Sequence, residues 1–243
     1  MLKPTTLFLI CSAALYVGAC TGATEGPARG EALYNNCKTC HAADGHGNPA
    51  IKAPAIAGLP AWYIENQVKG YQKGTRGLHF NDIAGMRMRP MALSILNERA
   101  LLARQLEKLS PAEKETLVKD QAQGAANLKE VAAYIAAMAP IKSEATLTTA
   151  KAATGKAHYA ACAACHGADG MGVKAMNAPP IAGAQDWYIA EQLMNFRNGV
   201  RGYDPAIDAN GATMAGMSKA LPNDQAVLDV AAFIAALPRT AAK

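Results

Sequence analysis

The pattern of apolar and polar positions in this chain occurs twice. Moving the sequence along itself by 125 residues, the distance from Trp62 to Trp187, brings many flanking residues into register. Further along, the apolar stretch 131–138 resembles the stretch 230–237. Self-similarity at a fixed distance indicates two copies of one structural unit.

Each copy is predicted to be helical. Alanine is plentiful and aromatic residues make up only 6% of the chain, which favours helices over strands. Glycine and proline dominate the connections, which are therefore predicted to be loops. We predict an all-α fold of two tandem domains. The predicted helices are residues 28–40, 60–72 and 127–139 in the first copy, and 153–165, 185–198 and 224–236 in the second.

The first copy carries an insert, at residues 97–124, that the second lacks. It is predicted to form one helix, a stop and a second helix that restarts after Ser110, because Pro111 and Glu113 complete the signature of a capped helix start. The insert is interpreted either as a cover or docking face, or as a surface hairpin with a packing role only. The expected domains are 28–140, including this insert, and 141–243.

The amino-terminal segment is predicted to direct export. A lysine precedes the short apolar run 7–17 and small residues follow it, which is typical of a signal peptide, expected here at residues 1–19. The run is too short to cross a bilayer. Cys20 ends a stretch that resembles a bacterial lipobox, so we expect a lipid on Cys20 to attach the protein to a membrane, with residues 20–27 as a flexible tether. The alternative is cleavage beside an ordinary cysteine. Either way, the expected location is the periplasm.

Charge adds little about partners. The formal net charge is +5 over the full sequence, and it falls close to zero once the signal peptide and the carboxylates of the cofactors inferred below are counted. The sequence does not indicate a nucleic-acid partner, because proteins that bind nucleic acids concentrate a strong positive charge. We predict no nucleic-acid partner.

The candidate chemistry lies in a pentapeptide that is present once in each copy. Cys-x-x-Cys-His is the attachment signature of c-type haem, in which two thiols bond to the porphyrin and the histidine binds the iron. Two copies in matching surroundings exclude an accidental match. We therefore predict two covalently attached haem c groups. The residues are Cys37, Cys40 and His41 in the first copy, and Cys162, Cys165 and His166 in the second.

The sixth iron ligand separates an electron carrier from an enzyme, because an open position admits a substrate. The methionine candidates are Met88 and Met91 in the first copy, and Met214 and Met217 in the second, each pair in register. Met86 has no counterpart in the second copy. The spacing does not choose within either pair, and the alternative role of a methionine is core filling.

The chain resembles the two-domain dihaem class I cytochromes c, most closely the cytochrome c4 group, over residues 28–238 apart from the insert. The resemblance favours Met88 and Met214 as ligands over their neighbours. It also implies that the carbonyl groups of Pro54 and Pro179 accept hydrogen bonds from the two ligand histidines. Large rings supply buried area, so Trp62 and Trp187 are expected in the core near the haems.

We therefore expect an electron carrier and no enzymatic activity of its own. The expected partners are a quinol-oxidising complex or a dehydrogenase upstream, and a terminal oxidase or reductase downstream. One alternative is a cytochrome subunit that works only inside a dehydrogenase or oxidase complex. The other is a dihaem oxidoreductase such as a peroxidase, which requires an open or displaceable ligand position.

Overall fold

The computed structural model describes residues 25–96 and 108–240. The expected signal peptide, Cys20 and the first helix of the insert lie outside these residues. Within them the chain forms α-helices, two short 3-10 helices and two isolated β-bridges. None of the described helices is both long and apolar enough to cross a membrane.

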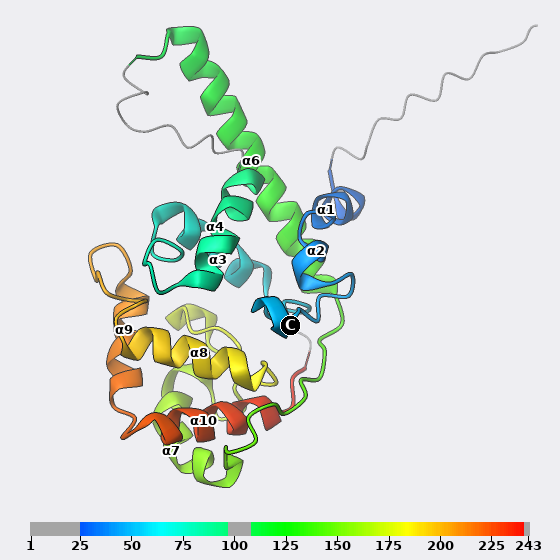
Figure 1. Ribbon diagram of the computed structural model, residues 1–243. Coiled ribbons are helices and arrows are strands. Elements are labelled where there is room, and N and C mark those ends of the chain that lie inside the picture. Colours follow the sequence, from blue (N-terminus) through cyan, green and yellow to red (C-terminus); the bar gives the residue numbers. More distant parts are fainter. Residues whose placement is uncertain (1–24, 97–107, 241–243) are drawn as a thin grey trace, which may run out of the picture.

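The helices fall into two sets that follow the sequence repeat (Figure 1). The first set is α1 (Pro27–Tyr34), α2 (Lys38–His41), α3 (Ala61–Lys73), α4 (Ile83–Ile95) and α6 (Pro111–Ala137). The second set is α7 (Ala152–His166), α8 (Asp186–Arg197), α9 (Ala209–Lys219) and α10 (Asp224–Ala236). The short 3-10 helices η1 (Pro49–Ile51) and η2 (Lys174–Met176) follow the two haem motifs.

The helix that leads into each haem motif differs between the copies. In the second copy α7 is continuous through the motif, as predicted for residues 153–165. In the first copy the predicted helix 28–40 is wrong, because α1 ends at Tyr34 and α2 begins only at Lys38. The break contains Asn35 and Asn36 where the second copy has two alanines. Asparagine side chains compete for backbone hydrogen bonds, whereas alanine favours the helix.

The prediction that the last helix of the first copy begins at Asn127 is also wrong. Helix α6 is continuous from Pro111 to Ala137, so the second helix of the insert and the last helix of the domain are one element. It begins with the predicted capping box between Ser110 and Glu113. Gly124 permits the close approach of α4 to this helix, because a side chain at that position would overlap the carbonyl group of Leu96 at the end of α4.

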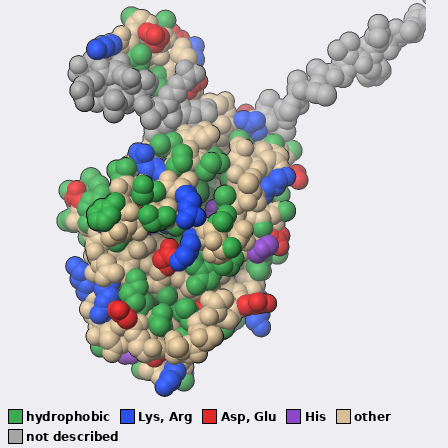
Figure 2. All heavy atoms as spheres, viewed as in Figure 1, with side chains coloured by type: hydrophobic (Ala, Val, Ile, Leu, Met, Phe, Trp, Pro, Cys, Tyr) green, Lys and Arg blue, Asp and Glu red, His purple; other side chains and the backbone are tan. Residues whose placement is uncertain are grey.

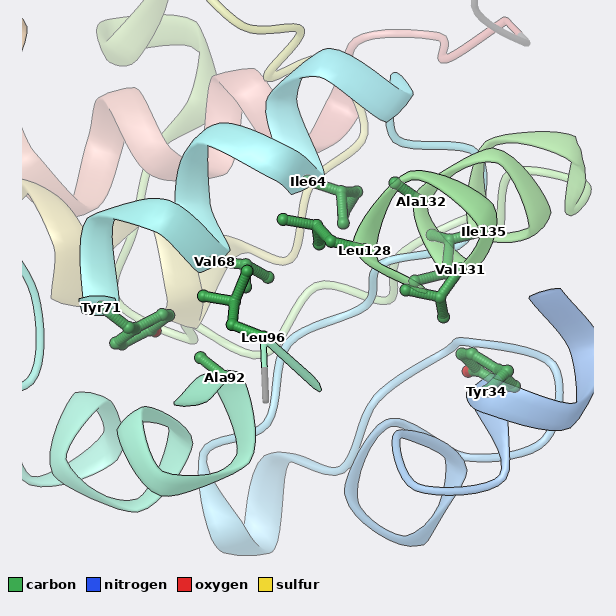
Figure 3. Packing of buried hydrophobic residues seen from close by; sticks show 10 residues of the cluster. All are labelled: Tyr34, Ile64, Val68, Tyr71, Ala92, Leu96, Leu128, Val131, Ala132 and Ile135. Atoms are coloured by element: carbon green, nitrogen blue, oxygen red, sulfur yellow. The ribbon is translucent and has the colours of Figure 1, made fainter. Parts of the chain in front are cut away.

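Each set of helices encloses its own core. In the first, Figure 3 shows side chains from α3, α4 and α6 meeting, among them Val68, Ala92 and Leu128. In the second, α10 packs against both α7 and α8. Its core includes Val227 and Val230, neither of which is exposed. Burial of such apolar faces is the main force that holds a helical domain together.

The two domains contact each other beside the loop that follows the first haem motif. The Gln185 side chain, just before α8, accepts a hydrogen bond of 2.8 Å from the Ala55 amide, and Lys52 pairs with Glu191 on α8. The amino-terminal half of α6 projects away from this body (Figure 1). Figure 2 shows charged side chains of both signs at the end of the projection, above a body whose visible face carries many hydrophobic side chains.

Candidate haem sites

His41 has the environment of a neutral ligand histidine. It is at the end of α2 and only 8% exposed. Its Nδ1 lies 2.8 Å from the Pro54 carbonyl oxygen, and because that oxygen can only accept, Nδ1 carries the proton. Nε2 therefore keeps the lone pair that a metal requires. Burial lowers the pKa of His41, opposed by this hydrogen bond, so the ring is neutral at pH 7.

His166 repeats this arrangement at the end of α7. It is 6% exposed, and its Nδ1 lies 2.9 Å from the Pro179 carbonyl oxygen. Burial again lowers the pKa of the imidazole, against the effect of the hydrogen bond. Both hydrogen bonds implied by the sequence resemblance are therefore present in the structure.

The paired cysteines lie one helical turn apart, directly before each histidine. Cys37 and Cys40 both line a cavity together with His41. Burial, with a smaller contribution from Cys40, raises the pKa of Cys37 to about 11, so this thiol is uncharged at neutral pH. Cys162 and Cys165 are half-buried at the equivalent positions. In the first domain, two thiols thus line a mostly apolar cavity, where they could bond to one apolar ring.

The candidate methionines lie on two helices that were not predicted. Asp82 caps α4 and Asp208 caps α9, each by accepting a hydrogen bond of 2.9 Å from a glycine amide three residues on. Met88 lines the cavity and packs against the core of its domain. Met91 also lines the cavity but is 42% exposed. In the second domain Met214 is half-buried and Met217 is 39% exposed.

The cavity in the first domain has a volume of about 330 Å³. His41 and Met88 both line it, together with mostly apolar side chains, including Ile56, Val68 and Ile135. An imidazole nitrogen and a thioether sulfur in one apolar cavity are the donor set of a low-spin haem iron. The volume lies in the range of cofactor pockets, about 300–1,000 Å³.

The cavity continues to the contact between the two domains, where its wall becomes cationic. Arg76 lines it, and its Nη1 donates a hydrogen bond of 2.8 Å to Gln67. Its repeat partner Arg201 donates one of 2.7 Å to Gln192. Each guanidinium also stacks on an aromatic ring, Arg76 at 4.6 Å from the Tyr71 ring centre.

Both arginines are 9% exposed, and the Nε of each is buried without a hydrogen-bond partner. Burial, and then the charge of Arg76, lowers the pKa of Arg201. Within the described residues neither guanidinium forms an ion pair. Buried cations without an ion-pair partner favour the binding of an anion beside them. The carboxylates of haem are such anions, so the residues present fit the cofactor.

These arginines were aligned by the repeat but were given no role from the sequence. The signal that could have identified them was the Arg-Gly pair present in both copies at matching distance from the haem motif. The expectation for the tryptophans is wrong. Trp62 and Trp187 are half-buried outside both core clusters, whereas the following residues, Tyr63 and Tyr188, line the cavity.

Comparisons with known proteins agree with this geometry. The sequence profile of the cytochrome c family matches residues 27–139 and again 152–238. A thiosulfate dehydrogenase electron acceptor from Stutzerimonas stutzeri is 30% identical over 193 residues, covering 75% of this chain and 71% of the relative. Cytochrome c4 from Pseudomonas aeruginosa is 28% identical over 187 residues, covering 73% and 74%.

Solved structures give the same fold. Cytochrome c4 from Acidithiobacillus ferrooxidans superposes with a TM-score of 0.58 at 25% identity, covering 84% of this chain and 99% of that one. A thiosulfate dehydrogenase from Marichromatium purpuratum gives 0.60 at 26% identity over 87% of this chain, which spans only 40% of that longer protein. The chain therefore belongs to the cytochrome c family, as a cytochrome c4-like, electron-carrying protein with two covalently attached haem c groups.

Proposed function

We propose that this protein is an exported dihaem cytochrome of the periplasm that carries single electrons between respiratory redox proteins. The observation that carries the proposal is the pair of buried, neutral histidines. Each has its Nδ1 fixed by a proline carbonyl group, which leaves Nε2 as the ligand atom. The repeat of this arrangement in both domains supports the same coordination at both irons.

The proposed ligands are His41 and Met88 in the first domain, and His166 and Met214 in the second. Met88 is favoured over Met91 because it is held by the core, and Met214 over Met217 because it is less exposed. Haem supplies one-electron exchange between ferric and ferrous iron, and a thioether ligand favours the ferrous state. Two such ligands would leave the iron no open position for a substrate.

The proposed electron donor is a dehydrogenase of the periplasm. Two relatives named thiosulfate dehydrogenase electron acceptor, at 30% and 27% identity, support a thiosulfate-oxidising dehydrogenase as this donor. A quinol-oxidising complex is the alternative donor, and a terminal oxidase or reductase is the proposed acceptor. Lipidation of Cys20 would keep the carrier beside a membrane that houses such complexes.

Spectra of ligand variants test the coordination. In the wild type both haems are expected to be low-spin with histidine and methionine ligands. Met88→Ala and Met214→Ala are each expected to convert one of the two haems to a high-spin form. The matched controls are Met91→Ala and Met217→Ala, one turn further along the same helices, and these should leave both haems low-spin. A high-spin haem in the wild type would refute the electron-carrier assignment and favour a dihaem oxidoreductase.

Reduction by a donor tests the partner. The oxidised protein is mixed with a purified thiosulfate dehydrogenase and thiosulfate, and reduction of the haems is followed by absorbance. Rapid reduction that requires both enzyme and thiosulfate is the expected result. Reduction by a quinol-oxidising complex, but not by this enzyme, would replace the donor and leave the carrier function intact.

A second candidate function is that of a fixed subunit in a dehydrogenase or oxidase complex. The projecting half of α6 favours it, because an exposed helix offers a surface for permanent attachment. Purification from solubilised membranes separates the two functions. A stoichiometric partner that remains bound at high salt would support the subunit, whereas a protein recovered alone would support the mobile carrier.

A further inference from the structure

The cationic wall between the domains contains a third arginine that breaks the repeat. Arg239 follows the last helix of the second domain and packs against Gly183. A Cβ atom added to Gly183 would lie 2.9 Å from the Cβ of Arg239. The repeat partner of Gly183 is Gly58, where the neighbour at 2.8 Å is Pro140. Both glycine amides donate 3.0 Å hydrogen bonds to the last helix of their own domain, which confirms that the positions are equivalent. The first domain therefore has a neutral proline where the second has a cation.

Arg239 belongs to the wall of the cavity described above, which residues of both domains line. It lines that cavity together with His41 and Met88. The ligand residues of the second domain, His166 and Met214, are not part of the same lining. Arg239 thus reaches from one domain to the haem cavity of the other.

The guanidinium of Arg239 is available for an anion in this cavity. Its Nη2 is buried and has no hydrogen-bond partner within the described residues. Burial lowers the pKa of Arg239, and the nearby hydroxyl group of Tyr63 opposes this effect. An arginine nevertheless remains charged at neutral pH. A buried cation needs a partner, and the carboxylates of haem are the anions that this cavity would receive.

We propose that Arg239, supplied by the second domain, raises the reduction potential of the haem held by the first domain. The inference rests on the proposed function, since it requires two low-spin haems that exchange one electron each. Ferrous haem carries one positive charge fewer than ferric haem, so a nearby cation favours the reduced state. Arg76 and Arg201 are related by the repeat, so each domain contributes one such buried cation. Arg87 also lines the cavity without a counterpart in the repeat, but it is exposed and donates to the Ile51 carbonyl oxygen. Arg239 is the one whose buried Nη2 lacks a partner within the described residues, so its effect distinguishes the two haems.

The test is a spectroelectrochemical titration of Arg239→Gln in the full-length protein. The equilibrium constant for reduction of the first haem is expected to fall about tenfold. For one electron this corresponds to a reduction potential lower by about 59 mV. The second haem should change by less than a third of that shift. The wave of the first haem is identified as the one that Met88→Ala displaces. Arg239→Lys keeps the charge and should restore more than half of the loss.

The matched control is Lys156→Gln, which removes one positive charge from an exposed position on α7 of the same domain. It should leave both waves in place, and thermal unfolding of each variant verifies folding. Equal shifts of both haems, or equal effects of Arg239→Gln and Arg239→Lys, would overturn the inference. In that case two low-spin haems would leave the proposed function standing, whereas a high-spin wild type would remove both.

Discussion

Gly155 is the point where the helix that ends in the second haem motif crosses the last helix of its domain. A side chain at this position of α7 would overlap the backbone carbonyl group of Asp229 on α10 and lie 2.8 Å from the Val230 nitrogen. Neither atom belongs to a flexible side chain, so the helices themselves must separate. Gly155→Ala therefore tests whether this close approach stabilises the domain.

Two opposing effects determine the magnitude. Replacing glycine by alanine inside a helix stabilises it by about 1 kcal/mol. Forcing an extra methyl group into a packed contact costs about 1–3 kcal/mol, and more where only the backbone can yield. We expect Gly155→Ala to lower the free energy of unfolding of the second domain by about 2 kcal/mol. For a domain of this size that corresponds to a fall in melting temperature of about 8–16 °C.

The assay is thermal unfolding followed by circular dichroism and by the haem absorbance, with Gly216→Ala as the control. Gly216 also lies inside a helix, α9, but a side chain there meets nothing within 4 Å. The control is expected to be neutral or to stabilise by about 0.5–1 kcal/mol. If Gly155→Ala proved as stable as the control, the helix crossing would not limit stability and the reasoning would fail.

Two further predictions concern caps and pH. Burial raises the pKa of Asp186, but hydrogen bonds from Thr146, Leu147 and Trp187 together outweigh it, so the pKa is lowered. Its stabilisation is thus present above the ordinary pKa of 3.8 and lost as pH falls through the lower folded value. Asp186→Asn should cost about 2 kcal/mol in unfolding at pH 7 and flatten the acid limb of a stability–pH curve. Ser110→Ala should cost about 1 kcal/mol of local stability, seen as faster amide hydrogen exchange at 112–114, with unchanged haem spectra. Unaltered exchange there would contradict the capping argument.

The sequence repeat predicted the two all-α domains, although it did not predict α4 and α9. Once 60–72 and 185–198 were aligned, the helical pattern of one copy supported that of the other, and α3 and α8 lie within a residue of the predicted bounds. The haem motifs were equally informative, because two thiols and an imidazole at this spacing have one dominant use. Local signals of this kind depend on residues close in sequence.

The errors arose where contacts between distant residues determine the structure. Gly124 has the character of a helix break, yet α6 continues through it and the backbone of Leu96 packs against this position. The cationic wall around Arg76 was not predicted, because a sequence gives the sign of a charge but not its burial. Arg239 was hidden for a further reason, since its role depends on the contact between two domains.

The continuity of α6 has a mechanical consequence. Its 27 residues extend for about 40 Å at the usual rise of a helix. One end projects into solvent, and at the other Val131 and Ile135 form part of the cavity wall. One uninterrupted element thus connects the projecting end with the wall of the first haem cavity, so a partner that bound the projection would hold the same helix that lines this cavity.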